Sequence, residues 1–190
     1  MFNLRIAASM AACSALVFAG VAGSVSASND STMTPENLLP MFQSAASTND
    51  AFPAEVKPEE LGIAAQAESR SLGSDSVARY WVTLSERSQV CLVMYIPGGY
   101  EVAGSTCGTL TDFNQKGLKL KLRSNIDGNI VSRVAYLFPS DVELTSLTAD
   151  SRGTESENFV ALTPEQNADL TPRDLARSGH SDFVFYPIGE

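Results

Sequence analysis

The sequence predicts an α+β protein with a mostly antiparallel β-sheet of roughly five to seven strands, short peripheral helices and one disulfide. Three observations support this. From residue 77 onward, short runs of β-branched and aromatic residues alternate with polar turns. Asp127-Gly128 lies between two such runs, as in a tight hairpin. The helix signals are short and begin with proline, so we expect helices only at the periphery.

The chain begins with the features of a secretory signal peptide. Arg5 precedes a stretch of apolar and small residues without charge, and Val25-Ser26-Ala27 has the small residues of a cleavage site. We therefore expect residues 1–27 to be cleaved off, leaving a secreted or envelope-associated mature chain without a membrane span. Lipidation at Cys13 is the alternative, but a further apolar tract follows that residue.

The charge balance is acidic, with 13 basic and 22 acidic residues and a formal net charge of −9. Arg5 is the only charged residue in 1–27, so the expected mature chain carries −10. Such a charge repels nucleic acid, and we expect no nucleic-acid partner. The basic residues from Lys116 to Arg123 alternate with leucine for most of their length, which is typical of a strand and not of a basic block.

We expect residues 28–50 to be a flexible segment with a short helix and residues 51–190 to form one globular α+β domain. Thr34 as the N-cap and Pro35 at the first helical position predict the start of that helix, and Pro40 ends it. A second short helix is predicted within Pro58–Ser69, although Gly62 lies inside it.

Two strands and a helix are predicted next. The segment 77–84 has the β-branched and aromatic residues of a strand, and 90–96 is apolar on both faces, as in a central strand. Residues 109–116 predict a helical turn or two, capped by Thr109 or Thr111 and ended by Gly117.

The second half predicts a meander of short strands. Leu118, Leu120 and Leu122 alternate with lysine and arginine and should face the core. Further strands are predicted across the Asp127-Gly128 turn and over three later segments. These strands lie at 130–138, 142–149, 158–163 and 181–186. The Thr-Pro pairs at 163 and 171 predict helix starts, in a connection that ends at Gly179.

Cys91 and Cys107 are the two cysteines that remain after cleavage at Ala27. Oxidising compartments favour pairing, and Pro97-Gly98-Gly99 can reverse the chain between them, so we expect a disulfide. Two alternatives stay open. Cys91 could be a nucleophile activated by the single histidine, His180, or both cysteines, His180 and a carboxylate could bind zinc, although no C-x-x-C or H-x-x-x-H spacing occurs.

Other catalytic signals are weak. The chain has no phosphate loop, dinucleotide fingerprint, nucleophile elbow or metalloprotease helix. The stretch 178–182 (SGHSD) holds triad residue types but is typical of a polar turn. The acidic pairs Glu59-Glu60 and Glu155/Glu157 would serve a glycosidase only if they faced one cleft. Asp127 and Asn129 could contact calcium, but the hairpin turn already accounts for both residues. We assign no catalytic, metal-binding or cofactor-binding residue and expect no cofactor.

The order of several segments resembles a group of secreted proteins of unassigned activity from high-GC Gram-positive bacteria. The segments are SVARYWVTL, QVCLVMYIPGG, STCGTLTDFNQKGLKLKL and LFPSDVELTSL. In that group a "vCLv" strand is followed by a Gly-rich turn, a second cysteine, a segment with Phe that ends in Gly, and a "vPdgV" turn. The resemblance covers about residues 50–162. It implies a disulfide between Cys91 and Cys107 and supplies no catalytic residue.

We expect a non-catalytic envelope or extracellular module that binds a protein or cell-surface component. The candidate surfaces are a sheet face, the loop Gly98–Ser105 and the C-terminal aromatic strand. The alternative is a small secreted hydrolase that uses acidic residues, a Cys91/His180 pair or a serine paired with His180.

Overall fold

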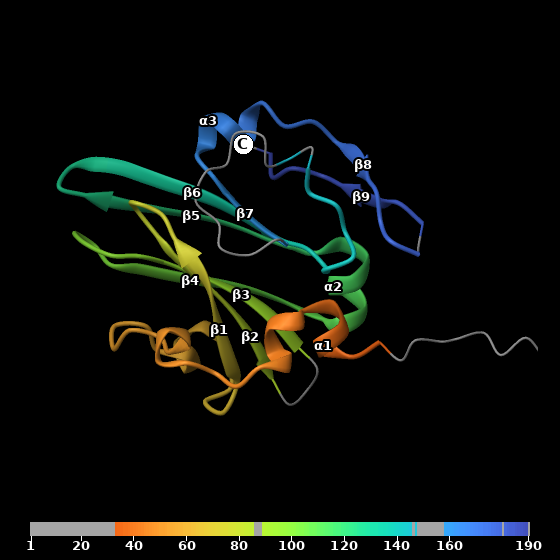
Figure 1. The fold of residues 1–190 in the computed structure, drawn as a ribbon. Helices are drawn as coiled ribbons and strands as arrows, with labels where there is room; N and C mark the ends of the chain where they lie inside the picture. The colour runs from red at the N-terminus through yellow and green to blue at the C-terminus, as the bar shows by residue number, and fades with distance from the viewer. Residues whose placement is uncertain (1–32, 86–88, 146, 148–157, 180, 190) are drawn as a thin grey trace, which may run out of the picture. The chain divides into compact units, whose positions relative to one another are not determined.

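In a computed structural model of the chain, the structure describes residues 33–85, 89–145, 147, 158–179 and 181–189. Within these residues, short helices and nine strands follow one another (Figure 1). Their bounds are α1 Pro35–Leu38, η1 Pro40–Gln43, η2 Thr48–Asp50, η3 Pro58–Leu61, β1 Glu68–Ser74, β2 Arg79–Ser85, β3 Gln89–Ile96, β4 Val102–Thr109, α2 Leu110–Lys116, β5 Leu118–Ile126, β6 Asn129–Leu137, β7 Phe159–Leu162, α3 Pro164–Ala168, β8 Arg173–Leu175 and β9 Phe183–Phe185.

The strands form three antiparallel sheets, which confirms the predicted fold class. Sheet A has the order β1-β2-β3-β4, sheet B the order β5-β6-β7, and β8 pairs with β9. Sheets A and B alone hold seven strands, and the short β8–β9 pair raises the described total to nine. Asp127 and Gly128 join β5 to β6 with φ angles of 51° and 84°, as the predicted hairpin turn requires.

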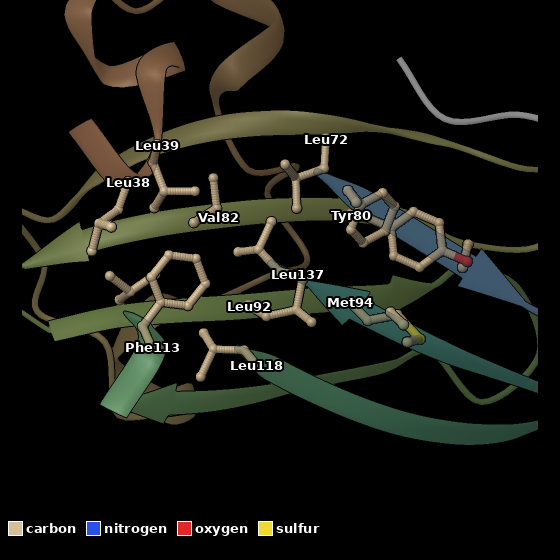
Figure 2. Packing of buried hydrophobic residues seen from close by; sticks show 14 of the residues in the cluster. Leu38, Leu39, Leu72, Tyr80, Val82, Leu92, Met94, Phe113, Leu118 and Leu137 are labelled. Carbon is tan, nitrogen blue, oxygen red and sulfur yellow. The ribbon is translucent and has the colours of Figure 1, made fainter. Parts of the chain in front are cut away.

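Sheets A and B pack face to face around the main core. Because side chains alternate along each strand, alternate residues of β2, β3 and β5 point into this layer, and Figure 2 shows several of them with others from β1 and β6. The main core includes Leu72, Tyr80, Val82, Leu92 and Met94 from sheet A, Leu118, Ala135, Leu137 and Phe159 from sheet B, and Leu39 and Phe113 from the helical segments.

Strand β3 is buried on both faces, which confirms the central-strand prediction. It pairs with β2 on one side and β4 on the other. Leu92 and Met94 belong to the main core, whereas Val93 and Tyr95 pack on the opposite face beside Val56. The segment before β1 therefore covers the outer face of sheet A.

The outer face of sheet B is covered by the β8–β9 pair. Phe183 and Phe185 of β9 are buried against Tyr136 of β6 and against Phe138, which directly follows β6. The ring centroids of Tyr136 and Phe185 are 5.1 Å apart, and those of Phe138 and Phe183 are 5.6 Å apart. The predicted C-terminal strand thus packs inside the same domain.

The described part of the expected flexible segment packs onto the globular domain. Thr34 caps α1 by accepting from the Asn37 N–H, as predicted, and Leu39 is fully buried in the main core. The buried guanidinium of Arg70 donates to the carbonyls of Met41 and Ser44 at 3.2 and 2.7 Å. Residues 33–50 thus belong to the same packed unit as the strands that follow.

The helix predicted within Pro58–Ser69 is shorter than expected. The 3-10 helix η3 ends at Leu61, and Gly62 takes φ 73° as its C-cap. Residues from Glu68 onward pair with β2 instead of continuing a helix. By contrast, α2 has the predicted Thr109 cap and Gly117 end.

Two predictions for the second half are wrong. In the described part of 142–149, only Val142 bridges another segment, Arg177. The alternating apolar residues of that stretch cover the outer face of sheet B from a loop. The residues after Thr171-Pro172, predicted to start a helix, form strand β8 instead. Pairing with β9 satisfies the backbone hydrogen bonds of both short strands, and Leu175 is buried in the same cluster as the phenylalanines of β9. The capping box predicted at Thr163 is present in α3.

Candidate binding groove

The two cysteines lie opposite one another on β3 and β4. Their sulfur atoms are 2.08 Å apart, which is bonding distance, and Cys91 is buried whereas Cys107 is exposed. With both sulfurs in one bond, neither is a free thiol for a nucleophile or a zinc ligand. The other partner of those alternatives, His180, lies outside the described residues, as do Cys13 and the whole of 1–27.

Of the two predicted acidic pairs, only Glu59-Glu60 lies in the described part of the chain. Glu59 and Glu60 lie exposed on η3, where Glu60 pairs with Lys57 at 3.2 Å. Glu155 and Glu157 lie outside the described residues. Within the part of the chain that the structure describes, no group of three His, Cys, Asp or Glu side chains is arranged to hold a metal ion.

A groove with an apolar floor lies where β4, α2, β5 and β9 meet. Its volume is about 570 Å³. Leu118, Phe138 and Phe185 are buried in its lining, and Lys116 and Lys119 are exposed there. The full lining is Thr106, Cys107, Gly108, Asp112, Gln115, Lys116, Gly117, Leu118, Lys119, Tyr136, Phe138, Val184, Phe185 and Tyr186.

Gly117 sets the floor of the groove, because α2 turns directly into β5 at this residue. Its φ is 62° and its ψ is −168°, and a Cβ at this position would lie 2.6 Å from the carbonyl oxygen of Leu137. Glycine therefore lets β5 start in contact with β6. At Gly108 of β4, by contrast, a Cβ would lie 3.4 Å from the Leu118 side chain, which is ordinary van der Waals contact.

Strand β9 forms the far wall and exposes apolar groups to solvent. Its alternation buries Phe183 and Phe185 and leaves Val184 and Tyr186 at 47% and 59% exposure. Lys119 Nζ donates to the Tyr186 carbonyl at 3.5 Å. An exposed apolar pair beside an apolar floor is a feature of interaction sites.

A buried hydrogen-bond network fixes the chain after β9. The Tyr136 hydroxyl donates to Asn167 Oδ1 and accepts from the Ile188 N–H at 2.8 Å. Asn167 Nδ2 donates to the Ile188 carbonyl at 2.8 Å. Burial raises the pKa of Tyr136, so its hydroxyl stays protonated and the network is neutral. The wall of the groove is therefore tied to sheet B.

The exposed side of β5 carries Lys119, Lys121 and Arg123, which we call the cation row. The three residues are exposed and alternate with Leu118, Leu120 and Leu122, which pack on the main core. A second cleft of about 410 Å³, over the outer face of sheet B, is lined by Lys121, Arg123, Ile130, Ser132 and Glu165 among others. The Lys-Leu alternation that favours a strand is also the sequence signal for this row.

The carboxyl groups with a shifted pKa have it lowered in each case. These groups are Asp50, Asp75, Asp112 and Glu165. For Asp75, burial acts to raise the pKa, but hydrogen bonds from Arg133, the N–H groups of Val77 and Ala78, and the Tyr80 hydroxyl together lower it. A general acid needs the opposite shift.

A polar cleft beside β1 and β2 also holds charged residues. Asp50 and Arg79 line it together with hydroxyl side chains. The Asp50 carboxylate already accepts from the N–H groups of Ser47 and Ser71, each at 2.7 Å. Its role in the cleft is therefore to fix η2 against β1.

The sequence named the C-terminal aromatic strand and the loop Gly98–Ser105 as candidate surfaces, and the structure separates them. Val184 and Tyr186 line the groove, whereas Tyr100, 78% exposed, lies at the opposite end of β5. Sequence reasoning missed Lys116, Gly117 and Lys119 as groove residues, because it took their segment only as a helix end and a strand.

No known protein family, curated protein or solved structure matches the chain. Among the described helices, none is long and apolar enough to cross a membrane.

Proposed function

We propose that this chain is an exported, non-catalytic envelope or extracellular module that binds a protein or cell-surface component in the groove between α2, β4, β5 and β9. The observation that carries the proposal is the exposure of Val184 and Tyr186 beside an apolar floor. Exposing these side chains costs free energy that a partner would recover on binding.

Two features favour binding over the hydrolase alternative. The sulfur of Cys91 lies at bonding distance from Cys107, which leaves it without nucleophilic character. The shifted carboxyl groups stay ionised near neutral pH, because their pKa values are lowered, whereas an acid catalyst must hold its proton.

Export is supported by the signal-like N-terminus and by the cysteine pair. Arg5 followed by an apolar stretch and Val25-Ser26-Ala27 is typical of a cleaved signal peptide. Disulfides persist mainly in oxidising compartments outside the cytosol. N-terminal sequencing of the protein from culture medium and envelope fractions should find a chain that begins at Ser28.

The binding proposal is tested with the mature chain, one double variant in the groove and one single variant as the control. The purified chain is added to envelope and medium protein fractions of the producing cells, and bound protein is quantified. Val184→Ser with Tyr186→Ser should lose most of the binding, because both residues are exposed and line the groove. Met33→Ser removes an exposed apolar residue that does not line the groove or the cleft over β5, and this variant should bind as the natural chain does. Equal binding by all three proteins would contradict the proposal.

A further inference from the structure

Resting on the proposed binding function, we propose that the partner presents an extended acidic peptide segment that pairs with the free edge of β5. Alternate Asp or Glu side chains of this segment lie opposite Lys119, Lys121 and Arg123. Its end enters the groove with an apolar side chain.

The backbone edge of β5 is unpaired between the groove and Tyr100. In sheet B, β5 pairs with β6 alone. The carbonyl of Asn125 points away from β6, because it accepts from the Tyr100 N–H at 3.4 Å. Backbone groups alternate in direction along an antiparallel strand, so those of Lys119, Lys121 and Arg123 point the same way. No described backbone group bonds to them outside the β5–β6 pairing.

The cation row is not neutralised within the described residues. None of the five ion pairs there includes Lys119, Lys121 or Arg123. Glu165 lines the same cleft as Lys121 and Arg123 but lies in no ion pair with them. This row is a local positive surface on a chain whose formal net charge is −9. Such a surface favours an anionic partner.

The spacing of the row matches an extended peptide. Same-face residues of a strand repeat at about 7 Å. A strand paired with β5 has the same repeat, and its outward side chains lie about 5 Å from their cross-strand neighbours. Carboxylates at every second position therefore reach Lys119, Lys121 and Arg123 in turn.

The same charges disfavour the other occupants of this edge. If a second copy paired through its own β5, lysine and arginine side chains would face one another across the new interface. Lysine on an edge strand also disfavours the addition of neutral strands, because its charge would lose water without gaining a partner. An acidic strand supplies that partner, so the same row disfavours a second copy or a neutral strand and favours an acidic one.

The groove supplies the apolar part of the recognition. Its lining includes Gly117, Leu118 and Lys119, so the free edge of β5 runs into it. Phe138 and Phe185 lie buried in the lining, and Tyr186 is exposed there. The preferred segment therefore alternates acidic residues and carries an aromatic or large aliphatic residue on the same face, beyond the last acid.

The direct test uses synthetic peptides and the mature chain. The probe is the acetylated, amidated peptide FTETETETF, titrated by calorimetry, with amide NMR to locate the binding site. FTKTKTKTF reverses the charge. A third peptide is FTETETETF with methylated glutamate nitrogens, which keeps the charge but removes the N–H groups that face β5. We expect FTETETETF to bind at least about tenfold more tightly than either control.

Chain variants separate charge from strand addition. Lys121→Gln removes one charge from the row and should weaken binding several-fold. Lys121→Pro removes an N–H that points away from β6, so the fold is kept while strand addition is blocked. Its binding should fall about tenfold or more. Lys57→Glu changes an exposed lysine directly before η3 and should have no effect. Circular dichroism and thermal unfolding check that each variant folds.

The outcomes divide cleanly. Shifts at residues 118–124 with the expected peptide ranking support the proposal. Shifts confined to 102–109, equal binding of the N-methylated peptide, or a dimer in sedimentation without peptide overturn it. If no peptide binds while the groove variant of the previous section still loses its partner, the acidic-segment inference fails and the binding function stands. If the acidic peptide binds as expected but the Val184/Tyr186 double variant still binds the envelope and medium proteins as the natural chain does, the proposed function fails in its stated form.

Discussion

Asp75 joins three segments through a single carboxylate. Its Oδ1 accepts from the N–H groups of Val77 and Ala78 at 2.7 and 2.8 Å. Its Oδ2 accepts from the Tyr80 hydroxyl at 2.8 Å and from Arg133 Nε at 2.7 Å. The Asp75 carboxylate thus links the turn before β2, the core residue Tyr80 and strand β6. The Arg133 side chain that pairs with it is only 14% exposed.

Replacing Asp75 with asparagine should destabilise the fold strongly. Asp75→Asn leaves the Arg133 charge without its partner, and we expect a loss of about 2 to 4 kcal/mol in the free energy of unfolding. Glu60→Gln breaks an exposed pair with Lys57 and should cost less than about 0.5 kcal/mol. Urea unfolding of the two variants measures both values. Similar losses in the two would contradict the role assigned to Asp75.

The same residue makes stability depend on pH. The pKa of Asp75 in the folded chain lies below its ordinary value of 3.8. Its contribution is therefore complete above the unfolded pKa, about 3.9, and is lost as the pH falls through the folded pKa. The difference in unfolding free energy between the natural chain and Asp75→Asn should shrink between about pH 4 and pH 2. A difference that stays constant across this range would argue against the ion pair.

At the scale of elements, Gly117 shows how one residue without a side chain places α2 and β5. A Cβ there would meet the Leu137 carbonyl oxygen at 2.6 Å, in a backbone conformation that only glycine adopts readily. Gly117→Ala should cost about 3 kcal/mol or more. Gly62 also has positive φ but has no atom within 4 Å of its Cβ position, so Gly62→Ala should cost about 1 kcal/mol. Chemical denaturation ranks the two variants, and equal costs would mean that the close approach of β5 and β6 is not required.

Elements with a local signal could be predicted from the sequence. Thr34, Thr109 and Thr163 were assignable as caps because a cap is formed by residues within one turn of the helix. Strand β3 was assignable because its apolar residues fill both faces. The strand β8 was not, since its conformation depends on pairing with β9 through a contact that no local pattern encodes.

The groove could not be predicted for a similar reason. The sequence marked the C-terminal aromatic strand and the alternation of lysine with leucine. It did not show that β9 passes beside Gly117 and Lys119, more than sixty positions earlier. Only the packing of β8–β9 on sheet B brings these segments together.

At the scale of the whole molecule, the segment before β1 contributes to the same core as the sheets. Leu39 is fully buried beside residues of β2 and β3, so Leu39→Ala should lower the free energy of unfolding by about 2 to 4 kcal/mol. Met33→Ala changes a residue at 42% exposure and should cost less than about 0.5 kcal/mol. Thermal unfolding in both variants tests this. If Leu39→Ala were as stable as Met33→Ala, residues 33–50 would not be part of the cooperative unit.

The covalent link acts on the whole unfolding equilibrium, because it restricts the unfolded chain. Cys91 and Cys107 are 16 positions apart. In the chain-entropy account, closing such a loop stabilises the fold by about 3 kcal/mol, so the double variant Cys91→Ala with Cys107→Ala should lose about that amount. The natural chain should have an intact mass lighter than the dithiol form by two hydrogen atoms, and the reduced natural chain should unfold as the double variant does. A natural chain that titrates two free thiols, or a double variant as stable as the natural chain, would contradict this. Because β4 is held to β3 by backbone pairing along its whole length as well as through sulfur, we expect the reduced chain to keep its fold at neutral pH and to unfold at lower urea concentration.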